Sequence, residues 1–498
     1  MRAQTRTSPW SVGAPASKRH NRASGLDGQI HPLERRVTTT NDAWRTRSLR
    51  AVWHPCTQMK AHGAPGSRGP DDAPLIAVAR AEGPWLVDVD DRRYLDAISS
   101  WWTNLFGHGH PAIRAALVDQ LATLDHVMLA GLTHAPVVEL SERLGALTSL
   151  GHAFYASDGA SATEIALKMS AHAWRNAGQP GKNRFVAVAG GYHGETAGAL
   201  GVTDIALFRD AYGPLVRPAA TVASPDARLA RAGEGSVDVA LRAARDLDRW
   251  LADHADETAA LIVEPLVQCA AGMAMHDAAY LREARAACDR HGVHLIVDEI
   301  ATGFGRTGTM FAHQQAGILP DFICLSKGLT AGTLPLAAVL TTDPVYEAFY
   351  DDDTAQGFLH SHSYTGNPLA CRAALASLDL FEREDVIASN AGRAAMIGRH
   401  LEPLDSHPRL RHARRTGMVW AWDVADAAPG FARRYARHAL AQGLLMRPIG
   451  ATLYTMPPYV LGEAEAEHLA RGAWAALEAT LAEEDGRATP VVVDASIP

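Results

Sequence analysis

Two hydrophobic patterns alternate along the chain from about residue 53 onward. Apolar residues at three- and four-residue spacing predict amphipathic helices over residues 237–251 and 466–481, with Ser236 as the expected N-cap of the first. Between such segments lie short continuous apolar runs, which are typical of parallel strands buried on both faces. These runs cover residues 259–263, 295–297 and 322–325. The alternation predicts an α/β fold with a mainly parallel central sheet and flanking helices.

Composition is that of an ordinary globular protein. Of the 498 residues, 47% are hydrophobic and 20% charged, and the formal net charge of −8 gives no reason to expect nucleic acid or a membrane surface as partner. No apolar run approaches the roughly 18–20 residues that span a bilayer. The five cysteines are odd in number and widely spaced, which favours reduced thiols in a soluble cytoplasmic protein. At about 150 residues per domain, the length favours two or three domains.

The first part of the chain differs from the rest. Residues 1–36 carry seven Lys and Arg residues but only two acidic ones, Asp27 and Glu34, among Ser, Thr, Pro and Gly. Such composition describes an organellar transit peptide as well as a disordered extension. We expect a disordered extension over residues 1–45 and leave it out of the fold argument.

The strongest local motif is the segment 295–300, in which an apolar strand ends in Asp298 and Glu299. A carboxylate at the carboxyl end of a buried strand lies where α/β sheets bind their ligands. P-loop ATPases share this ending but also need Gly-x-x-x-x-Gly-Lys-Ser/Thr, and the nearest candidate, residues 178–183, has the wrong spacing and no hydroxyl. Residues 303–308 read Gly-x-Gly-x-x-Gly, but the acid expected about 20 residues later for a dinucleotide site is not at a strand end.

A lysine follows the next apolar strand, in the sequence Ser326-Lys327-Gly328. A lysine at a strand end is ordinarily a surface residue whose charged group reaches solvent. In a partly desolvated site, however, its amine loses charge more easily and can attack an aldehyde to form a Schiff base. Asp298 at the neighbouring strand end could keep a pyridine nitrogen protonated, and this pairing is what pyridoxal phosphate chemistry requires.

Two further segments fit the same cofactor. Residues 157–161 join a strand-like run to a predicted helix, and the small Gly159 and Ala160 allow backbone amides at the helix N-terminus to reach a phosphate. The same residues are also ordinary turn and cap residues. Tyr192, within residues 190–194, supplies an aromatic ring that could cover a planar cofactor.

Taken together, these motifs resemble the class III, fold-type-I pyridoxal-phosphate aminotransferases, over residues 53–481. The motifs are residues 157–160, 191–194, 298–300, 303–308, 326–328 and 366–368. The resemblance implies a fold-type-I transferase with a large cofactor-binding domain and a smaller α+β domain. The domain boundaries it implies are 46–105 and 375–484 for the two parts of the small domain, 106–374 for the large domain and 485–498 for a tail.

The resemblance also implies roles for single residues. Lys327 holds the cofactor through its Schiff base and then moves protons at the substrate carbon, and Asp298 pairs with the pyridinium nitrogen. Tyr192 lies over the ring and contacts substrate. Gly159 and Ala160 offer backbone amides to the phosphate.

Three more stretches resemble the members of this family that act in biotin biosynthesis. These are residues 53–55, 99–102 and 447–459. The likeness implies a homodimer with shared active sites, S-adenosylmethionine as amino donor and 8-amino-7-oxononanoate as acceptor. The residues it implies for substrate are Trp101, Tyr192, Lys327, Ser361 and Arg447, of which Arg447 holds the acceptor carboxylate. His362 and Ser363 of each subunit complete the phosphate site of the other.

Alternative functions stay open at this point. Another class III ω-aminotransferase would act on ornithine, lysine or 4-aminobutyrate, and a pyridoxal-phosphate mutase or decarboxylase could use the same fold. A cofactor-binding protein without turnover is a third alternative. We expect no metal site, because the two His-x-His pairs, 108–110 and 360–362, have no acidic or thiol partner nearby in the sequence.

Four residues depart from the family pattern. Cys56 stands where the family usually has tyrosine after His-Pro, so one aromatic wall of the substrate pocket is altered. His362 and Ser363 replace a common Pro-Thr pair, and serine keeps the hydroxyl. Ala160 stands where serine is frequent, which leaves a backbone contact and removes a side-chain contact.

Overall fold

The computed structural model describes residues 40–66, 69 and 72–486. Its centre is a seven-stranded sheet in which all strands except β12 run in the same direction. In spatial order the strands are β4 (His152–Ala156), β12 (Ala337–Thr341), β11 (Phe322–Leu325), β10 (His294–Asp298), β7 (Thr258–Val263), β5 (Arg184–Val188) and β6 (Ala220–Val222). The predicted mainly parallel sheet is confirmed, and the three apolar runs form β7, β10 and β11.

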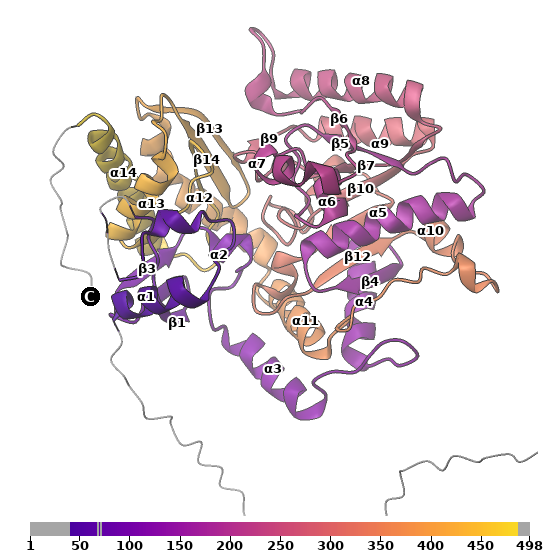
Figure 1. Cartoon of the computed structure of the whole chain (residues 1–498), viewed down its shortest axis with the longest axis horizontal. Helices are drawn as coiled ribbons and strands as arrows, with labels where there is room; N and C mark the ends of the chain where they lie inside the picture. The colour runs from indigo at the N-terminus through magenta and orange to yellow at the C-terminus, as the bar shows by residue number, and fades with distance from the viewer. Residues whose placement is uncertain (1–39, 67–68, 70–71, 487–498) are drawn as a thin grey trace, which may run out of the picture. The chain divides into compact units, whose positions relative to one another are not determined.

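Helices cover both faces of this sheet (Figure 1). Leu261 and Val263 of β7 pack toward α8 (Ser236–His254) and α9 (Ala279–His291). Ala260 and Ile262 of the same strand pack on the other face, against α5 (Gly159–Asn176). Both faces of β7 are buried, so its residues are apolar except for Thr258 at its start. The strand therefore lacks the alternation of polar and apolar residues that a half-exposed strand shows.

The N-cap prediction for the first amphipathic helix was wrong by one residue. Ser236 is the first helical residue of α8, and Gly235 is the N-cap. The Gly235 amide donates to the carboxylate of Asp238 at 2.9 Å. The Asp238 carboxylate in the first turn thus satisfies the backbone amide of the N-cap residue, as in a capping box. The second predicted helix is α14 (Glu463–Glu484).

Segments from both ends of the described chain build the smaller α+β part. The parallel pairing of β3 (Arg93–Asp96) with β15 (Leu444–Leu445) joins them. The N-terminal segment also gives α1 (Asn41–Ala51), β1 (Val78–Glu82) and β2 (Trp85–Asp88), and the C-terminal segment gives α12 (Val386–Asp405), β13 (Leu410–Thr416), β14 (Val419–Val424), α13 (Phe431–Ala441) and β16 (Thr452–Thr455). The boundary expected between residues 374 and 375 falls inside a continuous helix, α11 (Pro368–Arg383).

Residues 1–39 of the extension expected over residues 1–45 lie outside the described residues. The last residues of the extension are helical, which corrects the prediction of disorder there. The Thr40 hydroxyl caps α1 by accepting from the Ala43 amide, and the Asn41 side chain donates to Asp88 at 2.9 Å. These contacts anchor the helix to the β1–β3 sheet, so the ordered chain begins earlier than composition indicated. The predicted tail lies outside the described residues from residue 487 onward.

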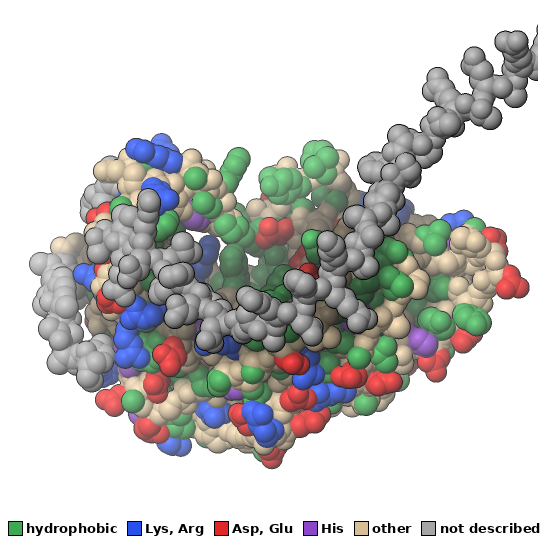
Figure 2. Space-filling view, turned by 90° about the horizontal axis from the view of Figure 1, so that it is seen from below, with side chains coloured by type: hydrophobic (Ala, Val, Ile, Leu, Met, Phe, Trp, Pro, Cys, Tyr) green, Lys and Arg blue, Asp and Glu red, His purple; other side chains and the backbone are tan. Residues whose placement is uncertain are grey.

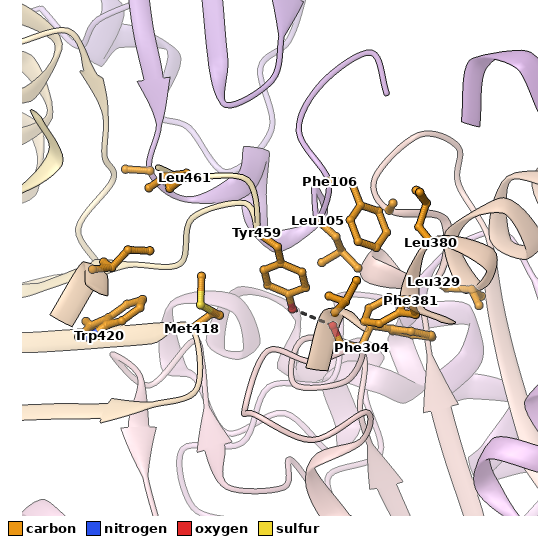
Figure 3. Packing of buried hydrophobic residues seen from close by; sticks show 14 of the residues in the cluster. Leu105, Phe106, Phe304, Leu329, Leu380, Phe381, Met418, Trp420, Tyr459 and Leu461 are labelled. Atoms are coloured by element: carbon orange, nitrogen blue, oxygen red, sulfur yellow. Dashed lines mark hydrogen bonds between the residues drawn. The ribbon is translucent and has the colours of Figure 1, made fainter. Parts of the chain in front are cut away.

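The Gly-x-Gly-x-x-Gly segment is a structural loop that follows β10. Its Arg306 is almost fully buried and donates to the carbonyl oxygens of Pro457 and Asn104, at 2.7 and 2.8 Å. The Tyr459 hydroxyl donates to the Phe304 carbonyl at 2.7 Å within an apolar cluster (Figure 3). The loop therefore joins the large sheet to residues of the smaller part. Gly305 and Gly308 have φ values of 85° and 105°, a backbone conformation that favours glycine whether or not a dinucleotide binds.

Charges on the face seen in Figure 2 are mixed rather than segregated. Basic and acidic side chains lie next to each other over this face. Within the described residues no helix is both long and apolar enough to cross a membrane. All five cysteines are free thiols, and Cys56 is the exposed one.

Candidate active site

A cavity of about 320 Å³ lies at the carboxyl ends of β10 and β11, beside the N-terminus of α5. Its lining includes five of the residues singled out from the sequence: Gly159, Ala160, Tyr192, Asp298 and Lys327. They come from four separate segments of the chain, which the sheet topology brings together. The cavity therefore lies where ligands bind in open α/β sheets.

Lys327 follows the end of β11 and is half-buried. Its φ of +42° is unusual for a non-glycine residue and is the kind of local strain that clusters at functional sites. Burial lowers the pKa of the Lys327 ammonium below its ordinary value, and the nearby Asp298 opposes that shift. The amine lies 5.2 Å from the centroid of the Trp102 ring. A greater share of neutral amine is therefore present at a given pH than for an exposed lysine.

Asp298 ends β10, and its partner in the register with β11 is Cys324, three residues before Lys327. The two functional side chains therefore extend from adjacent strand ends, as predicted. One carboxylate oxygen accepts from the Ile300 amide at 3.0 Å, and the other lies 2.7 Å from Nδ1 of His193. Both Asp298 and His193 are buried. The imidazole holds the carboxylate in one orientation beside the cavity.

The N-terminus of α5 supplies backbone amides to the cavity. Asp158 is the N-cap, and its carboxylate accepts from the Ser161 amide at 2.9 Å. The amides of Gly159 and Ala160 lie in the first turn, where a helix offers them no internal acceptor. The loop at Gly194 approaches this turn closely: its φ is +122°, and an added Cβ would lie 2.5 Å from Cβ of Ala160. Only glycine fits there, and the first-turn amides are groups that could hold an anion.

Tyr192 is fixed at both ends. Its backbone amide donates to the buried carboxylate of Glu264 at 2.9 Å, and its hydroxyl donates to Glu195 at 3.0 Å. Burial and the neighbouring Glu195 carboxylate raise the pKa of the Tyr192 hydroxyl. The hydroxyl is therefore a proton donor throughout the physiological pH range.

A second cluster lies beside the cavity and combines distant segments. The Arg447 guanidinium is 5.0 Å from the centroid of the Trp101 ring and donates to the Cys56 carbonyl at 3.3 Å. The Cys56 thiol lies 3.8 Å from the Glu195 carboxylate, which also accepts from Tyr192. Burial and Glu195 raise the pKa of Cys56, so the thiol stays protonated. We call these residues, Cys56, Trp101, Glu195 and Arg447, the mouth cluster.

Other predicted residues do not line the cavity of this chain. Ser361, His362 and Ser363 are absent from its lining. His362 lies 3.1 Å from His360, nitrogen to nitrogen, and His360 lies 2.8 Å from Nζ of Lys168. A role for these residues toward another subunit stays a prediction.

Four residues of the site were missed by the sequence analysis. Trp102, His193 and Glu264 line the cavity, and Glu195 belongs to both the cavity and the mouth cluster. Burial raises the pKa of Glu264 to about 7. His193 follows Tyr192 directly and Glu195 lies three residues after it, so that motif was a usable signal for them. Glu264 directly follows β7, a third strand end beside β10, and this position was a weaker signal.

Comparison with known protein families matches residues 67–477 to the family described as "Aminotransferase class-III". The chain belongs to this family. Among curated relatives, the Helicobacter pylori adenosylmethionine-8-amino-7-oxononanoate aminotransferase is 42% identical over 431 residues, covering 85% of this chain and 95% of the relative. The Nitratidesulfovibrio vulgaris enzyme of the same name is 40% identical, covering 86% and 81%.

Solved structures agree with this assignment. The adenosylmethionine-8-amino-7-oxononanoate aminotransferase of Methanocaldococcus jannaschii matches with a TM-score of 0.81 at 32% identity, covering 88% of this chain and 99% of that one. An amine transaminase from an uncultivated Pseudomonas species, in its PLP-bound form, matches with a TM-score of 0.80 at 32% identity, covering 86% and 99%. The fold-type-I prediction is confirmed, and the chain is an aminotransferase.

The residues of the cavity fit pyridoxal phosphate. Lys327 offers an amine in the cavity lining for the aldehyde, and Asp298 offers a fixed carboxylate for the pyridine nitrogen. The first-turn amides of Gly159 and Ala160 offer donors to the phosphate. These three requirements are met by groups around one cavity, and the aromatic Tyr192 lies in the same lining.

Proposed function

We propose that this class-III aminotransferase transfers the amino group of S-adenosylmethionine to the ketone of 8-amino-7-oxononanoate and yields 7,8-diaminononanoate for biotin synthesis. The names of its relatives at up to 42% identity support the proposal. The observation that carries it is the mouth cluster, in which Cys56 contacts both the Glu195 carboxylate and Arg447, and Arg447 in turn lies over the Trp101 ring.

The acceptor combines three features that suit this cluster. Its remote carboxylate matches the planar, bidentate guanidinium of Arg447. Its aliphatic chain matches the apolar face of Trp101. Its amino group, next to the reacting ketone, matches Glu195, which lies beside Tyr192 at the edge of the cavity. An acceptor with a single charged end would leave either Arg447 or Glu195 without an oppositely charged group of the substrate.

When bound, pyridoxal phosphate takes the amino group from the donor and later passes it to the acceptor. The protein's part follows from the geometry of its own residues. Lys327, once free, would move the proton from the donor carbon to the cofactor carbon in the first half-reaction, and a proton from the cofactor carbon to the acceptor carbon in the second, a task that its lowered pKa favours. Asp298, oriented by His193, holds a proton on the ring nitrogen. Trp102 and Tyr192 limit the access of water to the reacting atoms.

The assembly and the location belong to the same proposal. A homodimer in which His362 and Ser363 reach the phosphate of the partner is consistent with their distance from the lining of this chain's own cavity. A cytoplasmic location is supported by the five free cysteines.

Arg447→Ala is expected to lower kcat/KM for the acceptor by about 10- to 100-fold, because a charge-assisted hydrogen bond to the carboxylate is lost. The donor half-reaction should change far less. Single-turnover kinetics of each half-reaction measure the two effects separately. Arg93→Ala is the matched control, since Arg93 also stacks on a tryptophan, at 4.4 Å from the Trp85 ring, away from the cavity. An equal loss in both half-reactions would contradict the carboxylate assignment.

A panel of amino donors tests the proposal as a whole. The purified holoenzyme is mixed with S-adenosylmethionine, ornithine, lysine or 4-aminobutyrate, and the absorbance of the bound cofactor is followed. A response to S-adenosylmethionine, followed by formation of 7,8-diaminononanoate on adding the acceptor, is the expected result. A response only to ornithine, lysine or 4-aminobutyrate would favour another ω-aminotransferase activity. A solved ω-transaminase of Pseudomonas jessenii, at 26% identity and a TM-score of 0.82, is a structural relative with such an activity in its name. Donor consumption without amino transfer would favour a mutase or decarboxylase.

A further inference from the structure

The turn that carries the paired tryptophans has an unusual backbone. In α2 (Ser99–Trp102), four successive non-glycine residues have positive φ values of 52°, 46°, 73° and 71°. In this left-handed region, Cβ lies too close to the following carbonyl oxygen, so L-residues visit it singly and not in runs. The run can persist only because its surroundings impose it.

Asp96 supplies the main anchor of this turn. It ends β3, is fully buried, and accepts from the Ser100 amide at 2.8 Å and from the Ser100 hydroxyl at 2.7 Å. Its second oxygen also lies 2.9 Å from Nε2 of His108. A further hydrogen bond runs from the Ser99 hydroxyl to the Met456 carbonyl at 2.8 Å. The backbone amide held by Asp96 lies inside the left-handed run itself.

The turn directs consecutive tryptophans to two different cationic groups. Trp102 points inward: its indole N–H donates to the Tyr454 hydroxyl at 3.1 Å, and its ring lies 5.2 Å from Nζ of Lys327. Trp101 is 43% exposed and lies 5.0 Å from the Arg447 guanidinium. In a right-handed turn, successive side chains would be arranged around the helix axis in the opposite sense. Trp101 and Trp102 could then not keep their contacts with Arg447 and Lys327 at the same time.

We propose that Asp96 is a positioning residue for catalysis, which holds the left-handed turn and thereby places Trp102 at Lys327 and Trp101 at the mouth cluster. The substrate side of this inference rests on the proposed function, because it takes Trp101 and Arg447 as the surface that meets the acceptor. Asp96 itself touches neither the cavity nor the mouth cluster, so its effect must pass through the tryptophans.

The test uses three variants of the full-length holoenzyme. Asp96→Asn keeps the shape of the side chain but replaces one accepting oxygen with a donor. KM for the acceptor is expected to rise by at least about tenfold, while cofactor affinity stays within about twofold. Adding Ser100→Gly to Asp96→Asn should recover at least about threefold of the loss, because glycine adopts the left-handed conformation without the Cβ clash.

The control is Asp96→Asn combined with Ser149→Gly. Ser149 is exposed and ends α4 (Ala135–Thr148) with a φ of 60°, so this change relieves the same kind of strain far from the site. It should recover none of the lost acceptor binding. Equal recovery by both glycines, or no recovery by Ser100→Gly, would overturn the proposal. If Asp96→Asn does not fold, Ser100→Ala removes only the 2.7 Å hydroxyl bond, and an unchanged KM in that variant would count against the proposal.

A readout that needs no substrate separates this inference from the proposed function. Near-ultraviolet circular dichroism of the apoenzyme should lose tryptophan signal in Asp96→Asn and regain it in the variant with Ser100→Gly. An unchanged signal in Asp96→Asn would overturn the positioning role. If the donor panel rejects S-adenosylmethionine, KM is measured with whichever amine the wild type accepts, and the dichroism result still decides whether Asp96 holds the turn.

Discussion

Transamination by the Lys327→Ala variant is expected to be lower than wild type by at least about 10⁴-fold, the upper end of what a positioned acid–base group contributes. Two functions are lost together: the amine that holds the cofactor covalently, and the base that moves the proton at the substrate carbon. The absorbance band that marks covalent attachment of the cofactor should also disappear. Steady-state kinetics and an absorbance spectrum of the purified variant measure both effects.

Lys182→Ala is the matched control for this result. Lys182 is buried and also has a lowered pKa, caused mainly by desolvation, but its Nζ donates to the Gly292 carbonyl away from the cavity. The control variant should lose some stability and keep both the absorbance band and the turnover of the folded protein. A normal band in Lys327→Ala would contradict the assignment.

Asp298→Asn is expected to lower kcat by about 10²- to 10³-fold, the range found when one preorganised electrostatic group is removed from a dry site. An amide oxygen in place of the carboxylate cannot stabilise a proton on the ring nitrogen as strongly, so less negative charge is drawn from the reacting carbon. The cofactor should still bind through its phosphate and Lys327. Kinetics of the donor half-reaction, followed in stopped flow, measure the loss directly.

The adjacent carboxylate provides the comparison for Asp298. Glu299 is fully buried, but it accepts from the amides of Ala312 and His313, at 3.0 and 2.8 Å, and does not line the cavity. Glu299→Gln should therefore lower the melting temperature and leave kcat of the folded enzyme within about threefold. Equal losses of kcat in the two variants would mean that Asp298 acts through stability and not through the ring.

The site residues that the sequence predicted correctly lie in short local motifs or directly after predicted strands. Asp298 and Lys327 each follow an apolar run short enough to be a buried strand, and parallel neighbours end at the same edge of a sheet. The Gly159–Ala160 turn and Tyr192 lie in short motifs of small and aromatic residues. For these residues, knowing the secondary structure and the sheet was enough to bring them to one cavity.

The remaining features depend on contacts between distant segments. The left-handed turn at Ser99–Trp102 is imposed by Asp96 and by the Met456 carbonyl, and no local propensity favours it. The pairing of Cys56 with Glu195 joins residues 139 positions apart. The helix over Asn41–Ala51 is held by a hydrogen bond from the Asn41 side chain to Asp88. Composition does not show this contact, so the predicted disordered segment reached too far along the chain. Patterns of hydrophobicity carry no information about such pairings.

We expect the cofactor to be attached covalently to Lys327 in this cavity, and chemical trapping of that bond identifies the lysine. The chain has five lysines: Lys18, Lys60, Lys168, Lys182 and Lys327. Reduction of the wild-type holoenzyme with borohydride, followed by proteolysis and mass spectrometry, locates the phosphopyridoxyl group on one of them. Stoichiometric label on the peptide that contains Lys327 is expected. Label on any other lysine, or none after full loading with pyridoxal phosphate, would contradict that expectation.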